Sequence, residues 1–197
     1  MSHLFEAAHQ LRWLVPISRW TPLVALLGVA FALLGWRPLA RWARWYRLPT
    51  LGALLALAGV VALTLSPRGW YGNHRSLAEC VPTEWWQLAS SAAGVGGSAE
   101  SILNIVLFVP LGFCLVMASR RVMWPAALMA SMPIAIELLQ VVVPGRQCSP
   151  RDWLANALGG LIGVTAAALT RHILRRRARR HSPIQSPQHP DSVTSAL

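Results

Sequence analysis

Five long apolar stretches restrict the fold of this chain more than any other feature of its sequence. They are rich in Leu, Ala, Val and Ile, and they cover residues 18–36, 48–65, 101–118, 122–143 and 153–169. A helix of about 20 apolar residues crosses the ~30 Å hydrocarbon core of a bilayer, and it satisfies its own backbone polar groups there. The sequence therefore predicts an all-α fold, a polytopic membrane helix bundle with about five transmembrane helices.

The composition agrees with this fold class. Of the 197 residues, 54% are hydrophobic and only 13% are charged, whereas an average soluble domain has about 25% charged residues. We expect one transmembrane domain at residues 18–170. A short lead-in at 1–17, either an interfacial helix or disordered, precedes it, and the tail at 171–197 is first basic and then disordered.

The basic residues indicate how the chain crosses the membrane. The formal net charge is +11, and all 18 basic side chains are arginines. Basic chains either bind nucleic acid or collect positive charge in their cytoplasmic loops. Because these arginines lie between the apolar stretches and in the tail, we expect the second explanation and no nucleic-acid partner. Five spans put twelve arginines on one side and six on the other, which predicts an outside N-terminus and a cytoplasmic C-terminus.

Six polar residues stand in or beside the last three apolar stretches, where polar groups are costly and often functional. In the predicted topology they converge in the outer third of the membrane and in the short outer loop beside it, and we take them as the candidate ligand-binding residues: Asn104, Glu137, Gln140, Arg146, Asp152 and Asn156. We expect Arg146 to pair with Glu137 and with Asp152, since opposite charges at this depth need partners.

Each of these residues also has a structural interpretation. Asp152 follows Ser149-Pro150-Arg151, a typical helix start, and it either caps the fifth helix or has a second role as well. Asn104 and Asn156 either join helices by hydrogen bonds or contact a ligand. Glu137 is the hardest to explain by structure alone, because a carboxyl group in a span requires a partner.

Several small residues and prolines predict how the helices pack. Gly159 and Gly163 form a GxxxG pair beside Gly160, which is typical of closely approaching membrane helices. Pro110 and Gly112 interrupt the third stretch, where the proline is expected to kink the helix.

No metal or cofactor site is predicted from the sequence. The three cysteines show neither a CxxC motif nor zinc spacing, and no order of Ser, His and Asp suggests a nucleophile. Cys114 lies in an apolar stretch and is expected to pack there. Cys80 and Cys148 fall in loops and can pair if both face an oxidising compartment.

Several motifs between residues 65 and 163 resemble those of the VanZ-like family of bacterial membrane proteins. They are Leu65-Ser66-Pro67, Asn104-x3-Phe108-x-Pro110-Leu111-Gly112, Glu137-x2-Gln140, and Arg146-x5-Asp152-x3-Asn156-x2-Gly159-Gly160-x2-Gly163. The resemblance covers residues 50–170. It implies a multi-pass protein of the bacterial cytoplasmic membrane, in a family whose founding member is associated with low-level teicoplanin resistance. The loop at 147–150 departs from the pattern, because it lacks an acidic residue that relatives often carry.

Three functional hypotheses follow. The preferred one is a non-enzymatic envelope protein that binds or shields an amphiphilic anion, either a lipid-linked cell-wall precursor or a lipoglycopeptide, with Arg146 facing its phosphate or carboxylate. The second is a membrane enzyme acting on a lipid head group, in which Glu137 or Asp152 is the catalytic base and Arg146 stabilises negative charge. The third is a purely structural network that fixes the helices. Membrane lipid is a partner in all three.

Overall fold

The computed structural model describes residues 18–67, 84–146 and 148–180, and every regular element in them is a helix. The elements are α2 (Thr21–Trp42), α3 (Arg47–Thr64), α5 (Trp85–Ala93), α6 (Ala99–Ser119), α7 (Met123–Gln140) and α8 (Pro150–Arg180). The predicted all-α fold is therefore confirmed for the described part of the chain. The lead-in at 1–17 and the tail at 181–197 lie outside it.

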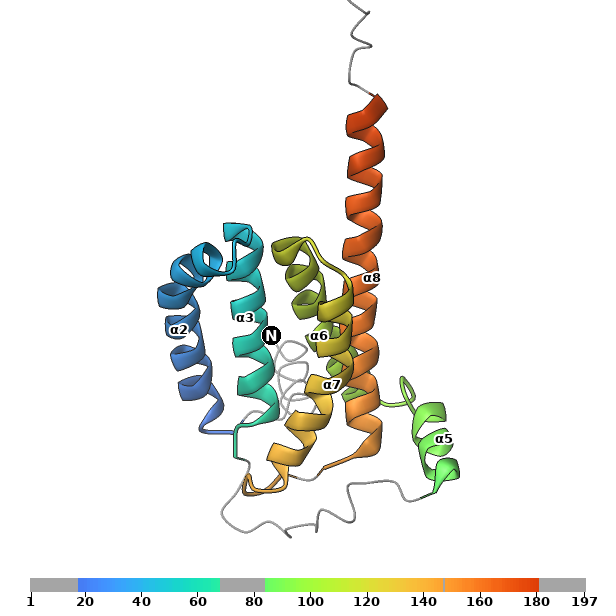
Figure 1. The fold of residues 1–197 in the computed structure, drawn as a ribbon. Helices are drawn as coiled ribbons and strands as arrows, with labels where there is room; N and C mark the ends of the chain where they lie inside the picture. The colour runs from blue at the N-terminus through green and yellow to red at the C-terminus, as the bar shows by residue number, and fades with distance from the viewer. Residues whose placement is uncertain (1–17, 68–83, 147, 181–197) are drawn as a thin grey trace, which may run out of the picture.

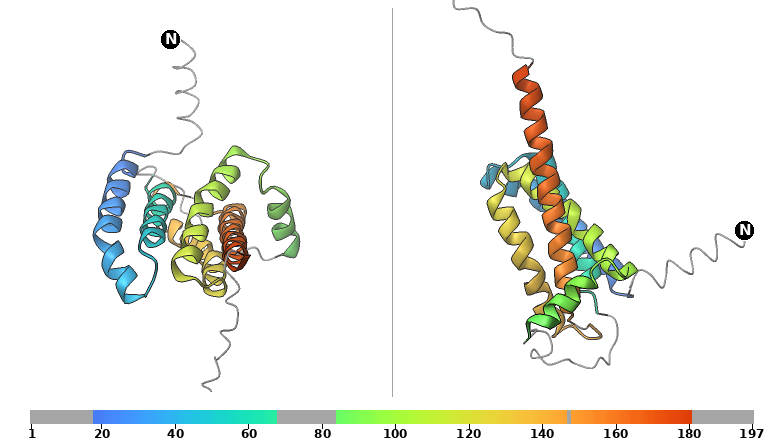
Figure 2. Two further views of the ribbon diagram at one scale, coloured as in Figure 1. Left: turned by 90° about the horizontal axis from the view of Figure 1, so that it is seen from above. Right: turned by 90° about the vertical axis from the view of Figure 1, so that its right-hand side faces the viewer.

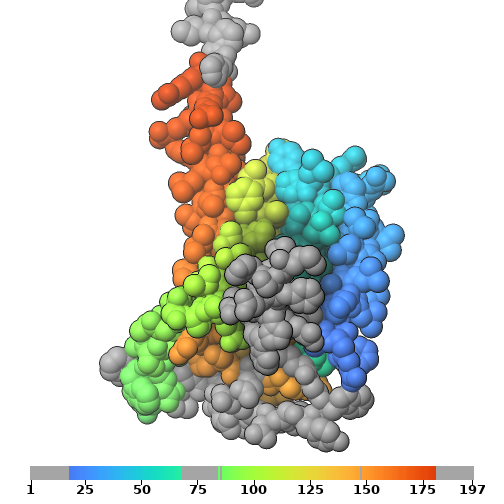
Figure 3. Space-filling model, turned by 180° about the vertical axis from the view of Figure 1, so that it is seen from behind, coloured from blue at the N-terminus to red at the C-terminus, as the bar shows by residue number. Residues whose placement is uncertain are grey.

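The five longer helices run up and down side by side (Figure 1). We call the end where α3 and α7 finish and α6 and α8 begin the polar end, and the end where α2 and α6 finish and α3 and α7 begin the arginine end. Seen along the helices, α2 stands at one edge against α3, and α5 stands at the opposite edge against α8 (Figure 2). The C-terminal turns of α8 stand clear of the other helices beyond the arginine end (Figure 3).

Four of the helices are long and apolar enough to cross a membrane, namely α2, α3, α6 and α8. The remaining member of the bundle, α7, contains Pro133 and has Glu137 and Gln140 in its last turn, and it is not among the helices apolar enough to cross a membrane. The outward face of α2 is strongly apolar; Leu34, for example, is 80% exposed. Because large apolar surfaces of this kind are suited to lipid rather than to water, the chain is a multi-pass helical membrane protein.

Three boundaries differ from the sequence-based expectation. The first apolar helix continues past residue 36 to Trp42, with Pro38 inside it, and bends over towards α3 (Figure 1). A proline removes one helical hydrogen bond and kinks a helix without necessarily ending it. The long loop expected at 67–100 contains the helix α5. The last helix extends to Arg180, because its arginine, leucine and alanine residues are strong helix formers.

Among the described helices, the closest packing is the seam between α6 and α8. A Cβ atom at any of three glycines would collide with a backbone carbonyl oxygen of the facing helix: Gly112 with Gly160, Gly159 with Ile105, and Gly163 with Val109. Only glycine allows two helix backbones to approach this closely. The GxxxG pair thus lies directly on the seam.

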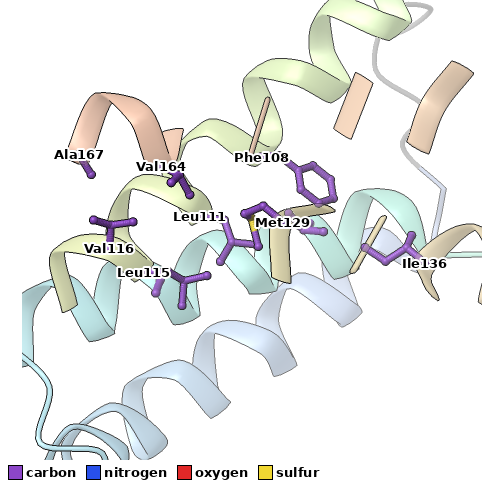
Figure 4. Close-up of a cluster of buried hydrophobic side chains, with 10 residues drawn as sticks. Phe108, Leu111, Leu115, Val116, Met129, Ile136, Val164 and Ala167 are labelled. Carbon is purple, nitrogen blue, oxygen red and sulfur yellow. The ribbon is translucent and has the colours of Figure 1, made fainter. Parts of the chain in front are cut away.

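The apolar core lies beside this seam and is shared with α3 and α7. Phe108, Leu111 and Met129 are almost fully buried there, with Ile136 and Val164 next to them (Figure 4). Gly160 makes room for Met129, whose Cβ would lie 2.7 Å from a Cβ at that glycine. Pro110 is exposed on the outer side of α6 and takes no part in the seam.

Candidate functional site

A cavity of about 280 Å³ at the polar end brings the six candidate residues together. It lies between the end of α3, the first turns of α6, the end of α7 and the start of α8. Its lining includes all six of them: Asn104, Glu137, Gln140, Arg146, Asp152 and Asn156. The convergence expected from the topology is thus present in the fold, and the role of these residues in binding stays a prediction.

Arg146 and Gln140 hold the end of α3. The Arg146 Nε donates to the Ser66 carbonyl oxygen at 2.9 Å, and its Nη2 donates to the Leu63 carbonyl oxygen. The Gln140 Nε2 donates to the Thr64 carbonyl oxygen at 2.9 Å. The last carbonyls of a helix have no partner within it, and a cation is favourable at that terminus. These two side chains therefore cap α3 from a distant part of the sequence.

The other carbonyls at this helix end are satisfied locally. The Leu65 N–H donates to the Val61 oxygen at 2.9 Å, and the Ser66 hydroxyl donates to the Ala62 oxygen at 2.5 Å. Pro67 follows and has no N–H to donate. The Leu65-Ser66-Pro67 tripeptide thus ends the helix and leaves carbonyl oxygens that accept hydrogen bonds from Arg146 and Gln140.

Glu137 joins α7 to the start of α8. Its Oε2 accepts a hydrogen bond from the Ser149 backbone N–H at 2.8 Å, and the side chain is only 4% exposed. Ser149 directly precedes Pro150, the first residue of α8. A carboxylate is favourable at a helix N-terminus because the N–H groups there carry partial positive charge. Glu137 therefore has a structural partner that the sequence did not indicate.

Asp152 lies in the first turn of α8 and is half-buried. The helix begins at Pro150, a residue favoured at that position, and the backbone N–H groups of Asp152 and Trp153 point to the Ser149 oxygen at 3.0 and 3.3 Å. Asp152 is thus inside the helix, three residues after Ser149, rather than at the capping position. Its expected pairing with Arg146 stays a prediction.

Asn156 differs from the other candidates because its buried side-chain oxygen accepts no hydrogen bond from the described residues. It is 1% exposed, and no described residue donates a hydrogen bond to its Oδ1. A buried polar atom without a partner costs about 1–3 kcal/mol. Asn104 is partly buried on the same cavity. The interhelical hydrogen bond expected as one explanation of Asn156 is therefore not formed at this oxygen.

The cavity has an apolar side and a polar side. Leu103, Val106 and Leu107 of α6 form part of its lining, and Val106 is 60% exposed. A second cavity of about 520 Å³ adjoins it and is lined mostly by polar residues of α5, α6 and the loop before α8. The two cavities share four lining residues, which are Glu100, Gln140, Arg146 and Asp152.

Sequence reasoning missed some members of the site. Glu100 lines both cavities. It lies in the first turn of α6, just after the N-cap residue Ser98, and an acidic residue there indicates a helix start rather than a binding site. The Leu63 and Thr64 carbonyls carry no side-chain signature at all. Ser149 contributes a backbone N–H, which is equally invisible to motif reasoning.

The structure also describes two of the cysteines and tests for a metal-binding group. Cys148 is disulfide-bonded and buried, whereas Cys114 is free. Cys80, which can pair with Cys148 if both face an oxidising compartment, lies outside the described residues. In the described ranges, no group of three or more His, Cys, Asp or Glu side chains is arranged to hold a metal ion.

Comparison with known proteins yields one match. A family model described as VanZ/LLP1 matches residues 50–171, a range that includes the six candidate residues and the glycines of the seam. No curated protein and no solved structure matches the chain. Because the matched range covers more than half of the sequence, the chain belongs to the VanZ/LLP1 family.

Proposed function

We propose that this protein binds an amphiphilic anionic ligand of the cell envelope in the cavity at the polar end, and that this binding contributes to glycopeptide tolerance. The ligand class is a lipid-linked cell-wall precursor or a lipoglycopeptide. The observation that carries the proposal is that one cavity combines the six candidate residues with an apolar wall and includes the buried, unpartnered Asn156 Oδ1.

The chemistry of the cavity suits an amphiphile. The Asn156 oxygen requires a hydrogen-bond donor, such as a sugar hydroxyl or an amide N–H. Leu103 and Val106 offer apolar contact on the side that faces lipid. A volume of about 280 Å³ is at the lower limit of small-molecule sites, so the ligand would place one segment here and extend into the adjoining polar cavity.

The proposal includes an orientation in which the polar end faces the outside of the cytoplasmic membrane. Two observations support it. Twelve arginines lie in the helices and turns of the opposite end or in the C-terminal turns of α8, which is typical of a cytoplasmic face. The disulfide-bonded Cys148 lies at the polar end, and disulfides persist in oxidising compartments.

In this proposal the six residues have two roles. Arg146, Gln140 and Glu137 act as positioning residues, because each holds a helix end through a backbone group. Asn104, Asn156 and Asp152 contact the ligand. Two donor groups of Arg146 already contact the Leu63 carbonyl of α3 and the Ser66 carbonyl just after it, so its planar fork does not meet an anion as a whole.

A structural role is the second candidate function, and the helix-end contacts favour it. If the site only fixes α3, α7 and α8, its residues matter for folding and not for a ligand. The alternative of a membrane enzyme that modifies a lipid head group through Glu137, Asp152 and Arg146 has weaker support, because the Glu137 Oε2 already accepts the Ser149 N–H. Binding remains the first candidate because a purely structural role leaves the buried Asn156 Oδ1 without a partner among the described residues.

The test separates the candidates in cells and in vitro. A strain lacking the protein is complemented with wild type, Asn156→Leu, Glu137→Gln or the control Thr165→Val, which alters an exposed polar residue of the same helix. Membrane levels are measured by immunoblot, teicoplanin susceptibility by inhibitory concentration, and binding by labelling with a photoreactive polyprenyl-diphosphate sugar.

We expect Asn156→Leu to reach the membrane at the wild-type level but to lose both labelling and tolerance. Glu137→Gln keeps a carbonyl oxygen for the Ser149 N–H and should retain both, and so should Thr165→Val. Full tolerance and labelling in the Asn156→Leu strain would contradict the proposal. Loss of that variant from the membrane would instead favour the structural candidate.

A further inference from the structure

Another cavity, at the arginine end, is lined by arginines of α3 and α8 and by the C-cap residue of α6. It has a volume of about 750 Å³ and lies between the start of α3, the end of α6 and the C-terminal part of α8. The four cationic lining residues are Arg47, Arg120, Arg171 and Arg175. We call this feature the arginine groove.

Negative charge does not balance these arginines within the described part of the protein. The acidic residues that the structure describes are Glu84, Glu100, Glu137 and Asp152, and all of them lie at or near the polar end. Four like charges around one groove repel one another, and an anion of suitable shape relieves that repulsion.

The backbone holds this groove in place. Arg120 has a left-handed conformation with φ 60°, which is uncommon for a residue other than glycine. Its guanidinium lies 3.9 Å from the centroid of the Tyr46 ring, a cation–π contact. The Tyr46 N–H donates to the Ala118 oxygen at 3.1 Å, which fastens the start of α3 to the end of α6. Arg171 and Arg175, four residues apart, share one face of α8.

Apolar residues line the same groove. Leu48 is 77% exposed, and Met117 and Leu174 contribute further apolar surface beside the guanidinium groups. A soluble phosphate ion has no apolar part that could contact these residues, whereas a phospholipid carries acyl chains next to its phosphate. Basic pockets between membrane helices bind anionic head groups on the cytoplasmic side, and arginine suits phosphate by its planar array of donors.

We infer that the arginine groove binds an anionic phospholipid of the membrane leaflet at that end of the bundle. Its phosphate lies among Arg47, Arg120, Arg171 and Arg175, and its chains lie against the apolar lining. This site is separate from the cavity of the proposed function, which lies at the opposite end. Its occupancy can therefore be measured whether or not a ligand binds at the polar end.

Lipid binding to the purified full-length protein tests this inference. Native mass spectrometry in detergent compares wild type with the double variant Arg171→Gln/Arg175→Gln, with added phosphatidylglycerol or phosphatidylcholine. The matched control is Arg176→Gln/Arg180→Gln, which removes the same charge with the same spacing from exposed positions of the same helix outside the groove. Size-exclusion chromatography of each variant shows whether the fold is retained.

We expect wild type to bind phosphatidylglycerol more tightly than phosphatidylcholine. The groove variant should lose roughly tenfold or more in affinity, since each arginine near a membrane surface contributes about 1 kcal/mol. The control variant should lose less than about threefold. An equal loss in both variants would show that only the diffuse charge of α8 matters, and would overturn the inference. Displacement of the lipid by millimolar inorganic phosphate alone would also overturn it, in favour of a soluble-anion site.

Discussion

The seam between α6 and α8 and the polar end join helices by different physical means. At the seam, glycines let two backbones touch, and no polar side chain takes part in the close approach. At the polar end, side chains of Arg146, Gln140 and Glu137 satisfy backbone groups at the ends of α3 and α8. One joint depends on shape and the other on hydrogen bonds to helix ends.

The two joints differ in how they tolerate change. A collision with a backbone carbonyl cannot be relieved by rotating a side chain, so the seam accepts no added atom at its glycines. The polar end depends on particular donors and acceptors, and a replacement that preserves one of them preserves the joint. Asn156 stands apart from both, because its buried oxygen supports neither joint. The residues of the two joints hold the fold, whereas the Asn156 Oδ1 has no hydrogen-bond donor among the described residues.

The largest effect is expected at the seam. Gly163→Ala places a methyl group against the Val109 carbonyl, and we expect it to destabilise the protein by about 3 kcal/mol in reversible unfolding by SDS from detergent micelles. Gly35→Ala is the matched control, because its Cβ would meet nothing closer than 3.9 Å. That variant should be as stable as wild type or slightly more stable, since alanine favours helix more than glycine does. Equal stability of both variants would show that α6 and α8 can move apart at the seam without loss of stability, and would contradict this prediction.

A smaller loss is expected when the cap of α3 is removed. Arg146→Ala leaves the Leu63 and Ser66 carbonyls without their donor, and we expect a loss of about 2–3 kcal/mol in the same unfolding measurement. Arg146→Lys retains the charge but not both contacts and should fall between this variant and wild type. The exposed Arg176→Ala should change stability by less than about 0.5 kcal/mol. If Arg146→Ala behaves like Arg176→Ala, Arg146 does not cap the helix.

The smallest effect on stability is expected for Asn156→Leu. Replacing an unpartnered buried amide by an apolar side chain of similar size should change the unfolding free energy by less than about 1 kcal/mol. Gln140→Leu makes the same kind of replacement but removes the donor to Thr64, and it should cost about 1–2 kcal/mol. The same cost for both variants would mean that Asn156 belongs to the joint and not to a ligand site.

Much of the architecture could be predicted because its signals are local. Apolar stretches of membrane-crossing length indicated the helices, and the bounds of α3, α6 and α7 agree with them to within a few residues. Motif order identified the family. Topology alone placed Asn104, Glu137 and Asn156 near one another, since alternate helix ends meet on one side of a membrane bundle.

The sequence by itself thus determined the helical membrane fold, the family and the set of polar residues at one end. Only the tertiary structure decided what those residues contact. Arg146 donates to a carbonyl 80 positions away, and Glu137 accepts from the backbone of Ser149. Every residue except proline has the same backbone donor and acceptor. The sequence therefore does not indicate which of these groups need a side-chain partner in the folded protein. Which backbone groups lack a partner depends on where each helix ends in space, and therefore on how α3, α7 and α8 pack together.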